Sequence, residues 1–324
     1  MKGIKVIGEN KVSISHTPTP TPSGHEAVVK IMATCICGSD LRQIRAGKTS
    51  GRVIGHEFAG VVVDAGPLVP IDILGTRVTG FPMITCLDCR DCRSGNHRDC
   101  VNKLSLGRDI DGSFSEFMKL DYRFLIKFPE ELTFEVAALA EHLACGYRIA
   151  QEISRNPLVT RKSKLLIVGD GPIGIANGIF LARLGFESVE ILGRNKKRLA
   201  IAEELSLKPV TATTIKSSYR VLVVSCEPSI EVYKLISSIK PSAIYSQVNL
   251  ASPELARVAG VVADDVLRGF AYHFSDFFAV MEFLVSNPEI SNKMVSRKMT
   301  FEKFSEEIIS NDFHKGPYKT FLSA

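Results

Sequence analysis

The stretch that decides the fold prediction is residues 164–174, which read KLLIVGDGPIG. Its first five residues form an apolar run typical of a buried parallel strand. A G-x-G-x-x-G pattern follows directly and includes Gly169, Gly171, Pro172, Ile173 and Gly174. Between a strand and a helix, glycines at this spacing let the backbone approach a pyrophosphate that rests on the helix N-terminus. The stretch therefore predicts a dinucleotide-binding turn.

Beyond this turn the chain alternates between helical and strand-like segments. We expect helices over residues 173–184, 196–205 and 231–239, and further strands over residues 188–192, 221–225 and 243–247. Alternating units of this length predict an α/β fold with a parallel, doubly wound sheet of the Rossmann type.

The N-terminal part of the chain has a different pattern. Residues 1–135 contain short strand-like runs, such as 26–32, 59–63 and 76–81, separated by Gly and Pro, which predicts an irregular β-barrel. Helical periodicity covers residues 134–153, and the tail predicts helices over 277–285 and 304–310. We therefore expect a discontinuous first domain, residues 1–143 and 273–324, interrupted by a nucleotide-binding domain, residues 144–272.

The end of the second predicted strand bears on the choice of cofactor. NAD sites usually carry an acidic residue there, which binds the ribose 2′-hydroxyl, but this chain has Gly193 and Arg194. Glu190 comes too early in the strand to replace it. Arg194, and Arg198 in the following helix, offer guanidinium groups that can bind a 2′-phosphate. The sequence therefore favours NADP(H) over NAD(H).

Half of the eight cysteines lie in one polar stretch with the spacing C-x2-C-x2-C-x7-C, namely Cys86, Cys89, Cys92 and Cys100. Four thiolates at this spacing complete the closed tetrahedron that structural Zn²⁺ prefers. A pair of disulfides is the alternative, and so is an Fe–S cluster, although its usual spacings are missing. A closed four-thiolate zinc site performs no chemistry by itself.

The composition sets the broad class of protein. The chain has 324 residues, of which 45% are hydrophobic and 23% charged, with a formal net charge of +5. These values are ordinary for a globular protein with two domains. We find no signal peptide and no run long enough to span a membrane, so we expect a cytoplasmic protein with no membrane partner.

Five motifs together resemble the zinc-containing medium-chain alcohol and polyol dehydrogenases, which include sorbitol-like and threonine-like dehydrogenases. They are Cys37-Gly38-Ser39-Asp40, Gly55-His56-Glu57, the four-cysteine stretch, Glu141 and the glycine turn. The resemblance covers nearly the whole chain. It implies a GroES-like catalytic domain beside the Rossmann domain, a second zinc ion in the cleft between them, and a homodimer or homotetramer.

The resemblance also implies roles for single residues. Cys37 and His56 would be the first two ligands of the catalytic zinc, and Ser39 would pass the proton between alcohol and solvent. Glu141 is our choice for the third ligand, with His142, Cys145 and Glu57 as alternatives. Such a zinc ion keeps an open coordination position, lowers the pKa of a bound alcohol and polarises the carbonyl in the reverse reaction.

One departure from the family pattern concerns the substrate. Many relatives carry a histidine five residues after the first zinc ligand, where this chain has Arg42. The proton relay could be shorter or could run through the cofactor ribose, or Arg42 could bind a phosphate or carboxylate of the substrate. We therefore expect a zinc-dependent oxidoreductase that transfers a hydride between NADP(H) and a secondary alcohol, polyol or sugar, with or without a phosphate group, or its ketone.

Two other functions compete with this one. The first is a carbonyl or activated double-bond reductase on the same scaffold. The second is a zinc-binding module for nucleic acid, because several arginines surround the cysteine stretch. That stretch has no following recognition helix and no aromatic residues between its basic ones, so we expect a small-molecule substrate and no nucleic-acid partner.

Overall fold

The computed structural model describes residues 1–48, 51–215, 219–227, 229–246, 266–268, 272–310 and 318–323. The chain divides into two compact units. Unit 1 consists of Met1–Glu141 and His273–Ala324, and unit 2 consists of His142–Tyr272. Helix α4 (Ala140–Arg155) begins at the end of unit 1 and continues into unit 2. The assignment of a catalytic and a nucleotide-binding role to these parts stays a prediction.

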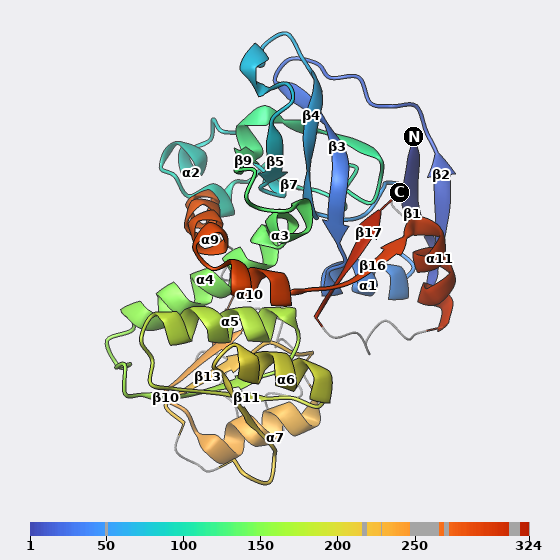
Figure 1. Ribbon diagram of the computed structural model, residues 1–324. Coiled ribbons are helices and arrows are strands. Elements are labelled where there is room, and N and C mark those ends of the chain that lie inside the picture. Colours follow the sequence, from blue (N-terminus) through green and yellow to red (C-terminus); the bar gives the residue numbers. More distant parts are fainter. Residues whose placement is uncertain are drawn as a thin grey trace. The chain divides into compact units, whose positions relative to one another are not determined.

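Unit 1 is built on a seven-stranded sheet. Its strand order is β16-β17-β3-β4-β5-β9, and β8 also pairs with β3. Figure 1 shows the long strands β3 and β4 side by side, and their pairing is antiparallel. The members of the sheet are β3 (Glu26–Cys35), β4 (Glu57–Ala65), β5 (Arg77–Gly80), β8 (Phe117–Asp121), β9 (Leu125–Lys127), β16 (Val295–Thr300) and β17 (Lys319–Ser323).

Short elements complete unit 1. Two small antiparallel pairs are β1 (Lys2–Gly8) with β2 (Lys11–His16), and β6 (Met83–Ile84) with β7 (Leu104–Ser105). The α-helices are α1 (Gly38–Arg45), α2 (Arg90–Arg93), α3 (Phe134–Ala138), α9 (Phe274–Ser286), α10 (Pro288–Lys293) and α11 (Phe301–Ser310). The 3₁₀ turns are η1 (Ile71–Ile73), η2 (His97–Asp99) and η3 (Tyr122–Phe124).

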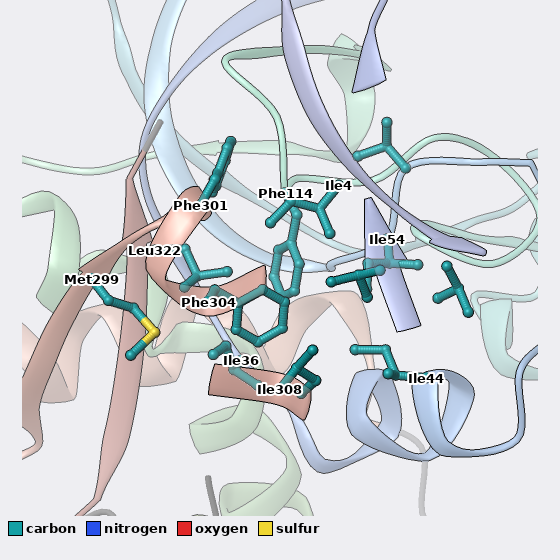
Figure 2. Close-up of a cluster of buried hydrophobic side chains, with 13 residues drawn as sticks. Ile4, Ile36, Ile44, Ile54, Phe114, Met299, Phe301, Phe304, Ile308 and Leu322 are labelled. Atoms are coloured by element: carbon teal, nitrogen blue, oxygen red, sulfur yellow. The ribbon is translucent and has the colours of Figure 1, made fainter. Parts of the chain in front are cut away.

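The two chain segments of unit 1 share one hydrophobic core. Figure 2 shows Ile4, Ile54 and Phe114 from the first segment beside Phe304 and Ile308 from helix α11. The rings of Phe114 and Phe304 meet edge to face, with centroids 5.9 Å apart. This packing joins the C-terminal segment to the N-terminal one. Strand β17 pairs with β3 at the same time, which places Phe321 opposite Cys35.

Unit 2 contains a six-stranded parallel sheet with the order β12-β11-β10-β13-β14-β15. Its strands are β10 (Lys164–Val168), β11 (Ser188–Leu192), β12 (Lys208–Val210), β13 (Val221–Val224), β14 (Ala243–Ser246) and β15 (Val266–Arg268), and its helices besides α4 are α5 (Pro172–Arg183), α6 (Lys196–Glu204) and α7 (Ile230–Ile239). Ile236 and Ile239 of α7 pack on one face of the sheet, against Leu166 and Leu222. The order reverses at β10, so the glycine turn after β10 lies at the switch point where such sheets bind nucleotides.

The fold class predicted from the sequence is confirmed. The predicted helices and strands of unit 2 match α5, α6, α7, β10, β11 and β13 within one residue at each end, and β14 as far as Ser246. Residue 247, the last of the predicted strand 243–247, lies outside the described residues. The expected helical stretch 134–153 is instead two helices, α3 and α4, separated at Leu139. Among the described residues, no helix is both long and apolar enough to cross a membrane.

Candidate functional site

The four cysteines of the polar stretch converge in a small lobe of unit 1, formed by α2, η2 and the loops beside them. Their sulfur atoms all lie within 4.8 Å of one another. The Sγ of Cys86 is 3.9 Å from that of Cys92 and 3.6 Å from that of Cys100. A tetrahedron of Zn–S bonds of about 2.3 Å has sulfur–sulfur edges of about 3.8 Å. The sulfur positions therefore fit a four-thiolate zinc site.

The cysteine lobe contains no disulfide, and its thiols differ in acidity, since burial raises the pKa of Cys92 to about 12 while the pKa of Cys86 is lowered. All eight cysteines of the chain lie in the described residues, and none is joined to another. Hydrogen bonds from the backbone N–H groups of Asp88 and Cys89 lower the pKa of Cys86 to about 6. A thiolate is the form that binds a metal ion.

A second set of ligand atoms lies where β3 leads into α1. The Cys37 sulfur, a ring nitrogen of His56 and a carboxylate oxygen of Glu57 lie within 4.8 Å of one another. Cys37 is the residue before α1, and Glu57 is the first residue of β4. One thiolate, one imidazole and one carboxylate are the mixed donors that a catalytic zinc ion takes in proteins. The residues present therefore fit such an ion.

Asp40 holds this second set in place. It is fully buried, and its carboxylate accepts a hydrogen bond from the Cys37 backbone N–H at 2.9 Å. Its other oxygen lies 3.2 Å from Nδ1 of His56, which leaves Nε2 for a ligand. Burial lowers the pKa of His56, but the charges of Asp40 and Cys37 outweigh burial and raise that pKa well above its usual range. Sequence reasoning gave Asp40 no role.

Glu57 has a partner from the other end of the chain. Lys319 of β17 donates to both carboxylate oxygens, at 2.6 and 2.5 Å, and to the carbonyl oxygen of Ile36 at 3.3 Å. Glu57 is fully buried, and Lys319 is 3% exposed. Burial lowers the pKa of Lys319, but the charge of Glu57 more than offsets it, so the pKa is raised. The pair therefore places a buried carboxylate and its buried counter-ion beside the partly exposed Cys37.

Two more predicted residues lie in unit 1. Ser39 is half-buried in the first turn of α1. Glu141 is 8% exposed in the first turn of α4, and it is not among the three residues whose ligand atoms converge. Burial, followed by nearby charges that include Glu57 and Glu141, raises the pKa of Cys35 well above its usual range. Cys35 is therefore a buried thiol, and the role of Glu141 stays a prediction.

The glycine turn of unit 2 has an open backbone. Gly169 has φ +118°, which side chains rarely adopt, and a Cβ on Gly174 would lie 1.9 Å from the Gly169 carbonyl oxygen. Gly171 precedes α5, with Pro172 at its first position and Ile173 next. A Cβ on Gly171 would meet no atom within 4 Å, and no side chain caps the helix. The free helix end and the space above it fit a pyrophosphate.

The end of β11 carries the basic residues expected from the sequence. Gly193 and Arg194 follow Leu192, and Asn195 caps α6 by accepting hydrogen bonds from Lys197 and Arg198. Glu190 is 3% exposed and accepts hydrogen bonds from Tyr219 and from Lys208, the latter at 3.0 Å. Glu190 is thus bound by neighbouring side chains of unit 2.

Residues 23–130 match the family model of the alcohol dehydrogenase GroES-like domain. An alcohol dehydrogenase from Escherichia coli CFT073, solved with NADH, aligns with a TM-score of 0.84 at 24% identity and covers 100% of this chain and 99% of its own. The chain therefore shares the fold of that dehydrogenase. A Sinorhizobium meliloti 1021 protein solved with NADP aligns with a TM-score of 0.82 at 23% identity, again over 100% of this chain and 99% of that one.

Relatives in sequence cover less of this dehydrogenase fold. L-Threonine 3-dehydrogenase from Coxiella burnetii (strain Dugway 5J108-111) is 31% identical over 203 residues, which is 61% of this chain and 58% of that protein. The chain thus matches less than two thirds of that relative's length. The resemblance to zinc-containing medium-chain dehydrogenases that the sequence predicts is nevertheless confirmed, by the GroES-like domain and by the fold of both units.

One expectation about the remaining cysteines is wrong. The apolar residues before Cys226 predict a strand position with a small core side chain, but β13 ends at Val224 and Cys226 is partly exposed just beyond it. Its side chain packs beside the glycine turn, where the Cβ of Cys226 lies 3.0 Å from a Cβ placed on Gly169. The predicted strand 221–225 ends one residue before Cys226, so the sequence itself indicates that Cys226 lies outside the strand.

Proposed function

We propose that the protein is a zinc-dependent oxidoreductase that transfers a hydride between NADP(H) and a secondary alcohol, polyol or sugar, or its ketone. The observation that carries the proposal is the convergence of Cys37, His56 and Glu57 inside a GroES-like dehydrogenase domain. Their donor atoms are those of a catalytic zinc site rather than of a closed structural one.

The proposed mechanism gives each residue of the set a task. Cys37 and His56 hold the metal ion, while Asp40 fixes the imidazole ring and the backbone of Cys37. Zinc bound there supplies a Lewis acid that lowers the pKa of the substrate hydroxyl. Ser39, beside Cys37 on α1, passes the hydroxyl proton towards solvent. A dinucleotide held at the glycine turn after β10 would supply the nicotinamide ring that accepts the hydride.

We propose Glu141 as the third metal ligand and Glu57 as an alternate. Glu57 already has a carboxylate oxygen within 4.8 Å of the other two ligand atoms. Its bond to Lys319 would have to be shared or broken for Glu57 to bind the ion. Glu141 belongs to the resemblance with polyol dehydrogenases, where a glutamate starts the corresponding helix. Zinc content of Glu141→Gln and Glu57→Gln variants distinguishes the two ligands.

The four-cysteine lobe is proposed to hold the second zinc ion. Its edges of 3.6 and 3.9 Å match the tetrahedron of a structural site. Four thiolates leave no open position for a substrate, so the lobe supports the fold and not the reaction.

The proposed preference for NADP(H) rests on Arg194 and Arg198 after β11. Guanidinium groups bind a phosphate dianion through paired, charge-assisted hydrogen bonds. Arg194→Gln should therefore weaken NADPH binding and leave NADH binding within about twofold. A wild-type protein that binds NADH much more tightly than NADPH would contradict this preference.

The whole proposal is tested by zinc analysis together with cofactor reduction. Purified protein should contain about two zinc ions per chain and should reduce NADP⁺, with NAD⁺ less effective, in the presence of alcohols, polyols or sugar phosphates. Assays of ketones and enals with NADPH distinguish the dehydrogenase from a carbonyl or double-bond reductase. A protein with no zinc and no reaction in either direction would refute the proposal.

The assembly of the protein is proposed from the family resemblance, and its location from the sequence. We propose a homodimer or homotetramer in the cytoplasm, acting on a small-molecule substrate. Light scattering coupled to size-exclusion chromatography measures the assembly, and a monomer at micromolar concentration would contradict it.

A further inference from the structure

Asp170, between the first two glycines of the turn, reaches across to the end of the neighbouring strand. One of its carboxylate oxygens accepts hydrogen bonds from the backbone N–H of Arg194 at 2.9 Å and of Asn195 at 2.6 Å. These N–H groups belong to the loop between β11 and α6, just where α6 begins. The glycine turn and the β11 end are thus tied together by one carboxylate.

The absence of a side chain at residue 193 makes room for this carboxylate. A Cβ on Gly193 would lie 2.3 Å from the Cβ of Asp170 and 2.4 Å from its carboxylate oxygen. Any other residue at position 193 would have to displace Asp170. The side chain of Asp170 therefore occupies the space that a residue at the end of β11 would fill.

The position of Asp170 decides which element supplies an acidic group at the end of β11. The strand itself brings no acidic residue, because Gly193 and Arg194 follow Leu192. The glycine turn supplies a carboxylate to the same place from 23 or 24 residues earlier in the chain. A carboxylate at this place binds the ribose 2′-hydroxyl of NAD and repels the 2′-phosphate of NADP.

Asp170 also competes for the groups that a 2′-phosphate needs. Backbone N–H groups at a helix start bind oxyanions, and two of them already bind this carboxylate. Its charge also acts on the nearby side chains: burial lowers the pKa of Arg198, and Asp170 partly offsets this. A phosphate arriving at Arg194 and Arg198 would therefore meet a carboxylate at the same amides.

We propose that Asp170 is a residue that sets cofactor selectivity: its carboxylate opposes the 2′-phosphate of NADP(H), accepts the 2′-hydroxyl of NAD(H), and so limits the preference that the arginines confer. The inference rests on the proposed binding of a dinucleotide at the glycine turn. It makes the choice of cofactor a balance between Asp170 on one side and Arg194 with Arg198 on the other.

The test is nucleotide binding to the purified full-length protein, measured without substrate by the fluorescence of NADPH and NADH. Asp170→Asn keeps the acceptor oxygen for the two N–H groups but loses the charge, and Asp170→Ala removes both. The ratio Kd(NADH)/Kd(NADPH) should rise about tenfold or more in the Ala variant and less in the Asn variant, and tenfold corresponds to about 1.4 kcal/mol. Competition by 2′,5′-ADP and by 5′-AMP should change in the same sense.

Glu187→Gln is the matched control. Glu187 is an exposed carboxylate just before β11, at the opposite end of that strand from Gly193. Removing its charge should leave the ratio within about twofold of wild type. An Asp170→Ala ratio that is also within twofold, with both nucleotides still bound, would overturn the inference but not the proposed function. A wild-type protein that binds neither nucleotide would overturn both.

Discussion

The two cysteine-containing sites of unit 1 differ in their surroundings more than in their sulfur chemistry. The cysteine lobe offers four like ligands on loops, and the Cys37 set offers three unlike ones at the junction of α1, β3 and β4. Partly exposed Cys86 is bonded by the backbone of its own lobe. His56 and Glu57, in contrast, have buried charged partners from elsewhere in the fold, Asp40 and Lys319.

This difference in surroundings indicates a different task for each site. A closed set of four thiolates needs only its own loops, because the metal ion itself organises them. A set that must keep one position open has to be held by residues that do not bind the metal. The proposed division of tasks is therefore structural for the cysteine lobe and catalytic for the Cys37 set.

The largest expected effect is that of Cys37→Ser. It should reduce turnover by about 10³-fold or more, or about 4 kcal/mol of transition-state stabilisation, while the melting temperature stays close to wild type. Cys35→Ala, two residues earlier in β3, is the control, because Cys35 is buried but is not part of the ligand set. Equal losses of turnover in the two variants would remove Cys37 from the mechanism.

Lys319→Met tests the buried support of the Cys37 set. Loss of the ammonium leaves the buried charge of Glu57 without this counter-ion, which should lower the free energy of unfolding by about 3–5 kcal/mol. Urea unfolding measures the change. Glu57→Gln in the same chain removes the second charge and should restore a large part of the loss. If the Lys319→Met protein alone is as stable as wild type, the ion pair does not support the site.

Cys86→Ser tests the cysteine lobe. It should lose one zinc ion per chain and lower the melting temperature by about 5–10 °C, because metal binding contributes to folding. Turnover per folded molecule should stay within about threefold of wild type. Ser94→Ala, in the same lobe, is the control and should keep both zinc ions. A Cys86→Ser protein of unchanged stability would show that the lobe does not need the metal.

Asp40→Asn tests a support that only the Cys37 set has. Among the described contacts of the cysteine lobe, no buried carboxylate plays the part of Asp40. The amide keeps one acceptor but loses the charge beside His56, so metal affinity and turnover should each fall about 10- to 100-fold. Zinc competition with a chelator measures the affinity. Asp64→Asn, at an exposed position of β4, should have no effect on either quantity.

The smallest expected effect is that of Arg42→Ala. Arg42 is exposed on α1, and its Nη1 lies 3.7 Å from a Cβ placed on Gly38, next to Cys37. The KM of an anionic substrate should rise about three- to tenfold, because an exposed guanidinium contributes about 1 kcal/mol, while the KM of a neutral alcohol stays unchanged. Arg42→Lys should keep part of the affinity. An equal change for both substrates would exclude selective anion binding.

The sequence predicted features that depend on neighbouring residues and missed those that join distant ones. The strand 164–168 and the helix after it follow from local apolar periodicity and glycine spacing, and both were confirmed as β10 and α5. The ion pair of Glu57 with Lys319 joins residues 262 apart, and no local pattern indicates it. Asp40 lies in a quoted motif, but its contact with His56 appears only when α1 and β4 are placed in space.

The same limit applies to the cofactor site. Sequence reasoning compared one position at the end of β11 with the family pattern and concluded that a carboxylate is missing there. The structure shows that Asp170 of the glycine turn occupies that space, because Gly193 has no side chain to exclude it. A residue from the glycine turn can thus fill the place that the end of β11 leaves empty. A single sequence does not reveal this.

The most direct test of the division of tasks is zinc stoichiometry and turnover measured together on folded Cys86→Ser and Cys37→Ser proteins. The wild-type protein should contain about two zinc ions per chain, and each variant about one. The ion kept by Cys86→Ser should support hydride transfer, and the ion kept by Cys37→Ser should not. A stable Cys86→Ser protein that has lost hydride transfer alone would contradict the account.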